Sequence, residues 1–415
     1  MMKKTVPFTR QELIKISETY PTPFHIYDEA AIRKNIRTFL KAFEWADFKE
    51  YYAVKACPNP YIIKILKEEG CGTDCSSLPE LIISEKCGVV GENIMFSSNE
   101  TTYDEYQAAM DLGAIINLDD ITHIPYLEKH CGIPEVISVR YNPGPERTGN
   151  SIIGDPVESK YGFTKPQIFE GFKMLKDKGA KRFGIHCFVI SNELNRDSYV
   201  ETAVMLFKLV KEVNDSLGIK IEFVNLSGGI GIPYRPEDEP VDLMAMGREI
   251  HNAYKQYIEK ENLAPLKIFS ESGRMVTGPY GYLVSKAIHE KHIYKEYIGL
   301  DANMANLMRP ALYGAYHHIT VMGKENLPHN KKYDVVGSLC ENNDKFAIDR
   351  MLPEIEIGDI IVIHDAGAHG FAMGFNYNGK LRSSELLLKE DGNIEMIRRG
   401  ETIDDYFATL DFSNL

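Results

Sequence analysis

The chain has 415 residues, of which 44% are hydrophobic, enough for a large buried core in two or three domains. Its 60 acidic residues outnumber its 47 basic residues, giving a formal net charge of −13. This charge argues against binding to nucleic acid or to an anionic membrane surface, and it favours small-molecule partners.

Nothing in the sequence indicates export or membrane insertion. The N-terminal segment MMKKTVPFTRQELIKISETYP carries lysines but no apolar signal core, and no later stretch approaches the roughly 18 apolar residues of a spanning helix. We therefore expect a cytoplasmic protein. The seven cysteines are scattered without a CxxC pair, which argues against a disulfide framework and against a zinc ribbon.

Strand-like runs alternate with amphipathic helical stretches over the first two thirds of the chain, which predicts parallel α/β structure. The expected strands cover residues 50–56, 72–77, 93–98, 114–120, 136–143, 182–189, 221–229 and 267–274. Eight strands, each followed by a helix or a crossover, predict a closed (β/α)8 TIM barrel, placed at residues 32–280.

After about residue 280 helical stretches become few and short strands many, which predicts a second domain with an antiparallel β-sheet. The early segment HIYD, residues 25–28, is expected to add a strand to it. The β-rich domain is therefore placed at residues 1–31 plus 281–415.

In a barrel of this kind the active site lies where the strands end. Lys55 ends the first predicted strand, the glycine turn SGG follows the seventh, and ESGR, with Glu271, ends the eighth. A lysine that binds an aldehyde, turns that approach a phosphate and a carboxylate that faces a pyridinium nitrogen are together what pyridoxal 5'-phosphate requires. We expect the apolar strand to keep the Lys55 amine partly desolvated.

Each of these features has an ordinary explanation when it stands alone. Lysines near strand ends extend to water, glycine turns satisfy a positive φ, and an adjacent carboxylate and guanidinium form surface salt bridges. Their combination favours the cofactor. His317 and His364 invite a metal site, but no HxH or HxxxH set with a carboxylate surrounds them, so no metal is predicted.

Longer motifs carry a family resemblance from about residue 25 to residue 387. They are YYAVKACPNP, GTDCSSLPEL, RYNPG, ESKYGF, SGG, ESGR, LMRPALYGAYH, CENNDKFAIDRMLPEIEIGD and HDAGAHGFAMGFNYNG. On these motifs the chain resembles the alanine-racemase-like (fold type III) decarboxylases that use pyridoxal phosphate, and among them most closely the diaminopimelate decarboxylases.

The resemblance implies a role for each matching residue. Lys55 would hold the cofactor and Glu271 would pair with its pyridinium nitrogen. The residues expected around the phosphate are Ser191, Gly228, Gly229, Gly273 and Arg274. The expected substrate contacts are Arg274, Arg309 and Tyr313, the last two for the retained carboxylate, and Glu341 for the distal amine. Cys340 would return a proton to Cα, and because Cys340 and Glu341 come from the partner subunit in this family, a homodimer is implied.

Several positions depart from the family pattern. Phe188 stands where a histidine would stack on the cofactor ring, and His369 stands where a tyrosine would contact the phosphate and line the substrate pocket. Ser227 replaces the first of three glycines, and Ser272 replaces a proline. Asn342 and Asn343 replace Ser-Gly after Cys-Glu.

The implied activity is decarboxylation of meso-diaminopimelate to L-lysine, the last step of lysine synthesis. Glu341 suits a distal amine and Arg309 with Tyr313 a distal carboxylate, and this substrate carries both. The first alternative is a decarboxylase of another diamino acid, lysine or ornithine in the L or D form. The second is a catalytically silent cofactor-binding homologue or an amino-acid racemase.

Overall fold

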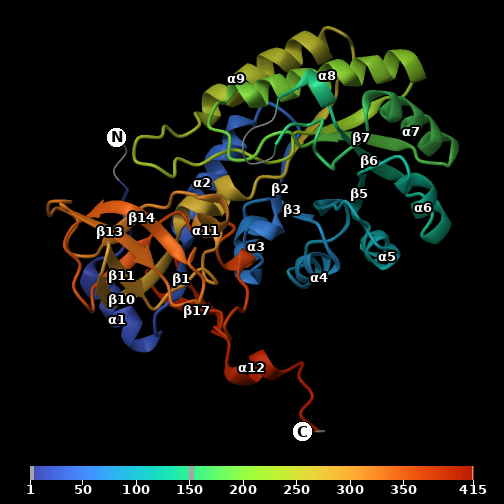
Figure 1. Ribbon diagram of the computed structural model, residues 1–415. Coiled ribbons are helices and arrows are strands. Elements are labelled where there is room, and N and C mark those ends of the chain that lie inside the picture. The colour runs from blue at the N-terminus through green and yellow to red at the C-terminus, as the bar shows by residue number, and fades with distance from the viewer. Residues whose placement is uncertain (1–3, 149–153, 414) are drawn as a thin grey trace. The chain divides into compact units, whose positions relative to one another are not determined.

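The computed structural model describes residues 4–148, 154–413 and 415. The chain divides into two compact units (Figure 1). The barrel unit comprises Arg33–Ile232 and Pro240–Val276. The sheet unit comprises the residues up to Ile32, the segment Pro233–Glu239 and the chain from Thr277 on. The sequence pattern did not predict that Pro233–Glu239 groups with the sheet unit.

Among the described residues, eight parallel strands close the barrel in chain order, and the last pairs with the first. They are β2 (Phe48–Ala53), β3 (Gly72–Cys75), β4 (Ile94–Ser97), β5 (Ile115–Leu118), β6 (Val136–Tyr141), β7 (Arg182–Cys187), β8 (Ile221–Asn225) and β9 (Lys267–Ser270). The predicted barrel is confirmed, although each strand ends before its predicted end, and β2 also starts earlier, at Phe48.

Helices connect the barrel strands. They are α2 (Glu29–Ala42), α3 (Pro60–Glu68), α4 (Leu78–Lys86), α5 (Tyr103–Asp111), α6 (His123–His130), α7 (Lys165–Asp177), α8 (Asp197–Leu217), α9 (Leu243–Tyr254) and the short α10 (Arg274–Thr277). Helix α3 shows how the sequence starts them: the Asn59 side chain accepts a hydrogen bond from the backbone N–H of Tyr61, and Pro60 fills the first helical position. No described helix is long and apolar enough to cross a membrane.

Apolar side chains fill the barrel interior below the strand ends. The rings of Phe223 and Phe269 stack with centroids 4.5 Å apart, and both pack in a buried cluster with Tyr51. Gly184 leaves the space that Phe223 occupies, because a Cβ there would lie 2.1 Å from that ring. The polar side chains of the barrel therefore gather at the carboxyl ends of the strands.

The sheet unit holds one sheet of nine strands within the described part of the chain. They are β1 (Phe24–Asp28), β10 (Gly281–His292), β11 (Glu296–Leu300), β12 (Ile319–Val321), β13 (Lys331–Val336), β14 (Lys345–Leu352), β15 (Ile360–Ile363), β16 (Ser384–Leu388) and β17 (Ile394–Arg398). The helices of this unit are α1 (Arg10–Thr19), α11 (Arg309–Tyr313) and α12 (Ile403–Phe407).

The predicted N-terminal strand is confirmed as β1, but the sheet is not purely antiparallel. β1 pairs antiparallel with β10 and parallel with β16, and β11 pairs parallel with β13. The predicted antiparallel sheet is confirmed for most of its strand pairs, and the two parallel pairs make it mixed. The sequence does not reveal the parallel pairs, because alternating burial along a strand is the same for both directions of pairing.

Candidate active site

Lys55 stands at the carboxyl end of β2, but outside the strand. The chain turns into a short 3₁₀ helix, Val54–Ala56, that carries it. Its side chain is 54% exposed, and its Nζ lies 4.0 Å from a carboxylate oxygen of Asp74. The Lys55 side chain is therefore only partly desolvated, and its amine stays accessible with a buried carboxyl group beside it.

Glu271, just beyond β9, is a buried carboxylate held by three donors. Oε1 accepts hydrogen bonds from Ser97 Oγ at 3.0 Å and from Asn225 Nδ2 at 2.7 Å, and Oε2 lies 2.9 Å from His186 Nε2. Burial opposes ionisation, but the His186 contact and the charge of Lys55 outweigh it and lower the pKa of Glu271 to about 2. Glu271 is therefore a fixed anion in the barrel.

His186 acts as a neutral donor in this arrangement. Burial lowers its pKa, and the charge of Glu271 only partly offsets that effect. Among the described residues, its Nδ1 has no hydrogen-bond partner, as expected when the ring proton sits on Nε2 and points at Glu271. A buried anion with neutral donors suits a ligand that brings a positive charge, such as a protonated pyridine nitrogen.

Asp74, on β3, is the second buried carboxyl group of the site. Burial, and next the negative charge of Glu271, raise its pKa well above 3.8. The site thus shifts the pKa values of its two buried carboxyl groups in opposite directions, that of Glu271 down and that of Asp74 up. The sequence places Asp74 at the end of a predicted strand but assigns it no role, and the barrel shows that it lies beside Lys55.

The residues predicted to surround a phosphate lie on the loops after β7, β8 and β9; they are Ser191, Gly228, Gly229, Gly273 and Arg274. These loops are packed backbone to backbone. A Cβ on Gly228 would lie 2.3 Å from the carbonyl oxygen of Glu271, and one on Gly229 would lie 2.3 Å from that of Ile190. The glycines are thus required for the close approach of the three loops.

Phe188 follows β7 on the same edge of the barrel. Its ring meets Tyr161 edge to face at 6.1 Å, and the guanidinium of Arg140 lies 5.2 Å from the centroid of the Tyr161 ring. The aromatic face of Phe188 is thus held by an aromatic neighbour, with no imidazole proton to offer.

The remaining predicted residues belong to the sheet unit; they are Arg309, Tyr313, Cys340, Glu341 and His369. Arg309 starts α11 and is buried, whereas Tyr313 ends it and is exposed. Cys340 has an exposed thiol next to Glu341. His369 adopts φ of +55° in its turn.

The loop that carries Cys340 and Glu341 is built around buried Asp344. Its two carboxylate oxygens accept hydrogen bonds from the backbone N–H groups of Leu339, at 2.8 Å, and Met304, at 2.7 Å. The N–H of Cys340 itself donates to Asn378 Oδ1 at 2.6 Å. The loop therefore presents the thiol and the carboxylate from a fixed backbone.

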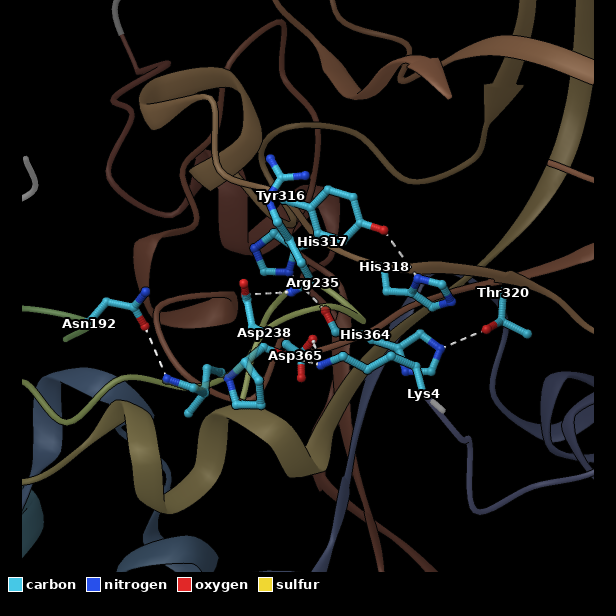
Figure 2. A network of polar contacts seen from close by, with 12 residues as sticks. Lys4, Asn192, Arg235, Asp238, Tyr316, His317, His318, Thr320, His364 and Asp365 are labelled. Atoms are coloured by element: carbon cyan, nitrogen blue, oxygen red, sulfur yellow. Dashed lines mark hydrogen bonds and ion pairs between the residues drawn. The ribbon is translucent and has the colours of Figure 1, made fainter. Parts of the chain in front are cut away.

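The histidines that first suggested a metal have other partners. His317 donates from Nδ1 to the carbonyl oxygen of His364 at 2.8 Å, and its Nε2 accepts from the Arg309 guanidinium at 2.9 Å. His364 Nε2 lies 2.8 Å from Thr320 Oγ1 (Figure 2). Both nitrogens of His317 are thus used within the protein, and one of them holds the guanidinium of Arg309.

Next to these histidines, Lys4 and Asp365 form a buried ion pair with Nζ 2.7 Å from Oδ2 (Figure 2). Burial raises the pKa of Asp365 from 3.8 to about 6, although Lys4 opposes the shift. Because the folded-state pKa is the higher one, the stability that Asp365 contributes is complete below about pH 4 and is lost as the pH rises through about 6.

We therefore expect Asp365→Asn to remove the loss of stability that accompanies ionisation of Asp365. As the pH rises from 4 to 7.5, the unfolding free energy of the variant should increase by about 3 kcal/mol relative to that of the parent protein. This figure follows from the difference between the ordinary pKa of 3.8 and the folded-state pKa of about 6. Calorimetric unfolding of both proteins across this range measures it. A difference that stays constant with pH would contradict the assignment.

The barrel, its accessible lysine and its buried carboxylate anion define a class of enzyme that binds a pyridoxal group. Comparison with known families agrees: residues 29–278 match the family described as pyridoxal-dependent decarboxylase, pyridoxal binding domain. The chain belongs to the pyridoxal-dependent decarboxylases.

Full-length relatives narrow the class. The chain is 43% identical to Protein TabA of Pseudomonas amygdali pv. tabaci, over 96% of this chain and 93% of that protein. It is 34% identical to a diaminopimelate decarboxylase of Methanothermobacter thermautotrophicus, over 95% of this chain and 92% of that protein. A crystal structure of a diaminopimelate decarboxylase from M. jannaschii in complex with L-lysine matches with a TM-score of 0.90 and 29% identity, over 97% of this chain and 95% of that one.

These comparisons confirm a pyridoxal-phosphate-dependent decarboxylase of diamino acids. They favour decarboxylation over a racemase or a silent homologue. The residues in the barrel fit the cofactor on physical grounds, since Glu271 supplies the anion that a protonated pyridine nitrogen needs and Lys55 the accessible amine that its aldehyde needs.

Proposed function

We propose that this enzyme decarboxylates meso-diaminopimelate to L-lysine, the last step of lysine synthesis, in the cytoplasm and as a homodimer. The observation that carries the proposal is the match over nearly the whole chain to a diaminopimelate decarboxylase and to a diaminopimelate decarboxylase bound to L-lysine. The buried guanidinium of Arg309, fixed by His317 at 2.9 Å and lying 4.7 Å from the Tyr234 ring centroid, is suited to grip a second carboxylate.

In this proposal some side chains bind the cofactor or the substrate, and another transfers a proton. The cofactor, when bound, supplies the electron sink that accepts the electron pair left as carbon dioxide departs. Glu271 would stabilise a positive charge on the cofactor's ring nitrogen, and Lys55 would supply the amine that holds the cofactor. Cys340, contributed by the partner protomer, would donate the proton of its exposed thiol to Cα. Glu341 binds the distal ammonium.

A second candidate, decarboxylation of another diamino acid, is favoured by the pocket departures. Phe188 and His369 change the chemistry offered to the cofactor and the substrate, and the relative named TabA is 43% identical without being named a diaminopimelate decarboxylase. Lysine and ornithine, in L or D form, lack the second carboxylate that Arg309 would bind.

The test is to incubate the holoenzyme separately with meso-diaminopimelate, lysine and ornithine in both chiral forms, following carbon dioxide and the chirality of the product. We expect L-lysine from meso-diaminopimelate.

Arg309→Met should raise the KM for meso-diaminopimelate by about tenfold or more, which is the scale expected when a charge-assisted contact is lost. Arg235, whose guanidinium also lies over a tyrosine ring, offers the matched control Arg235→Met, which should leave KM near the parent value. Release of carbon dioxide only from lysine or ornithine would contradict meso-diaminopimelate as the substrate.

A further inference from the structure

The turn that carries Glu271 and Gly273 is tied to β2 through a carboxyl group with no assigned role. Glu50 lies within β2 and has no exposed surface, and its Oε1 accepts a hydrogen bond from the backbone N–H of Ser272 at 2.6 Å. The carbonyl oxygen of Ser272 in turn accepts from the N–H of Ala53 at 3.4 Å. Both backbone groups of Ser272 are therefore bonded to the strand that leads to Lys55.

The other side of the same turn is bonded to the loop after β8. The N–H of Glu271 donates to the carbonyl oxygen of Ser227 at 2.9 Å, and the hydroxyl of Ser270 donates to the same oxygen at 3.1 Å. The turn therefore spans the point where the barrel closes. Glu50 is its side-chain anchor on the β2 side.

The surroundings of Glu50 favour the uncharged form of its carboxyl group. Burial is the main cause that raises its pKa well above 4.5, and the negative charge of Glu271 adds to the shift. Its second oxygen, Oε2, has no hydrogen-bond partner among the described residues. The contact that this carboxyl group provides is therefore the one its Oε1 makes with the buried N–H of Ser272.

We propose that Glu50 is a positioning residue that fixes the Glu271–Gly273 turn, and through it the orientation of the bound pyridoxal phosphate. This inference rests on the proposed contact of that turn with the cofactor, and it is independent of which diamino acid is the substrate. A side chain that lacks an acceptor at position 50 leaves a buried N–H without a partner, so the turn relaxes away from β2.

The experiment compares Glu50→Leu, which removes the acceptor at similar volume, with Glu50→Gln, which keeps it. Apo-protein is titrated with pyridoxal phosphate, and the absorbance and the induced circular dichroism of the bound cofactor are recorded. We expect Glu50→Leu to weaken cofactor affinity by about tenfold or more and to alter the induced dichroism, and Glu50→Gln to change affinity by less than about threefold.

A control variant tests whether a loss of barrel stability alone weakens cofactor binding. Ile221 is buried at the start of β8, away from the turn, so Ile221→Ala lowers the melting temperature without touching the site. We expect normal cofactor affinity and dichroism for that variant. Parent-like binding by Glu50→Leu, equal weakening by Glu50→Gln, or equal weakening by Ile221→Ala would each overturn the proposal.

A second pair of variants covers the case in which Glu50→Leu does not fold. Glu50→Met removes the acceptor with a flexible side chain of similar length, whereas Glu50→Gln keeps it. Only the methionine variant should lose affinity, and equal affinities would overturn the inference. Glu271→Gln separates the two proposals: if it leaves the induced dichroism unchanged while Glu50→Leu alters it, the ring contact of Glu271 fails and the role of Glu50 stands.

Discussion

Replacing Glu271 by glutamine is expected to lower kcat by about 10²- to 10³-fold while the fold survives, as for the loss of one preorganised charge in a buried site. Gln keeps the shape and can still accept from Ser97 and Asn225 on one side. Its NH₂ would face Nε2 of His186, which can move its proton to Nδ1, an atom with no partner among the described residues. The geometry is thus retained and the charge is lost.

Two measurements separate this result from unfolding. The melting temperature should change little, whereas the absorbance of the bound cofactor should shift because its ring nitrogen loses its anionic partner. Glu222→Gln is the matched control, since Glu222 lies on β8 and pairs with Arg182. The carboxylate of Glu271 has a pKa of about 2, so it should stay ionised and produce no acid limb in the pH profile of kcat above about pH 3. An unchanged kcat would contradict the assigned role.

Lys55→Ala should lower kcat by at least about 10³-fold, because it removes the amine that binds the cofactor. Borohydride treatment of the parent holoenzyme should fix the cofactor to the peptide that contains Lys55, identified by mass spectrometry. The same treatment of Lys55→Ala should fix none.

Lys49 provides the control for this experiment, because it lies on the same strand with its Nζ 5.3 Å from the centroid of the Tyr51 ring. Lys49→Ala should retain the label and the activity within about threefold, as expected of a surface substitution. Labelling of a lysine other than Lys55 would contradict the role of Lys55 as the residue that binds the cofactor.

The barrel and the two groups that define its chemistry could be predicted because their signals are local. Each strand is a short apolar run, and Lys55 and Glu271 directly follow such runs. The environment of Glu271 could not be predicted, since Ser97 and Asn225 come from strands 174 and 46 residues away. Only the closed barrel sets which strand ends face each other.

The errors have equally local causes. The apolar run before Lys55 predicts a strand to Ala56, but the backbone turns at Val54 into a 3₁₀ helix that carries the partly exposed lysine. The parallel pairing of β1 with β16 in the second sheet could not be predicted, because burial patterns do not encode strand direction. Ser272 looked like a minor exchange for proline, yet its N–H is the group that binds Glu50.

The pairing of β1 has a consequence for how the protein is made. Phe24 pairs with Ser384, so a strand that leaves the ribosome early has no neighbour on that side until almost the whole chain has been translated. The barrel strands, in contrast, pair in the order in which they are synthesised. Folding during translation would therefore complete the barrel first, while β1 remains an exposed edge that must be kept from pairing with other chains.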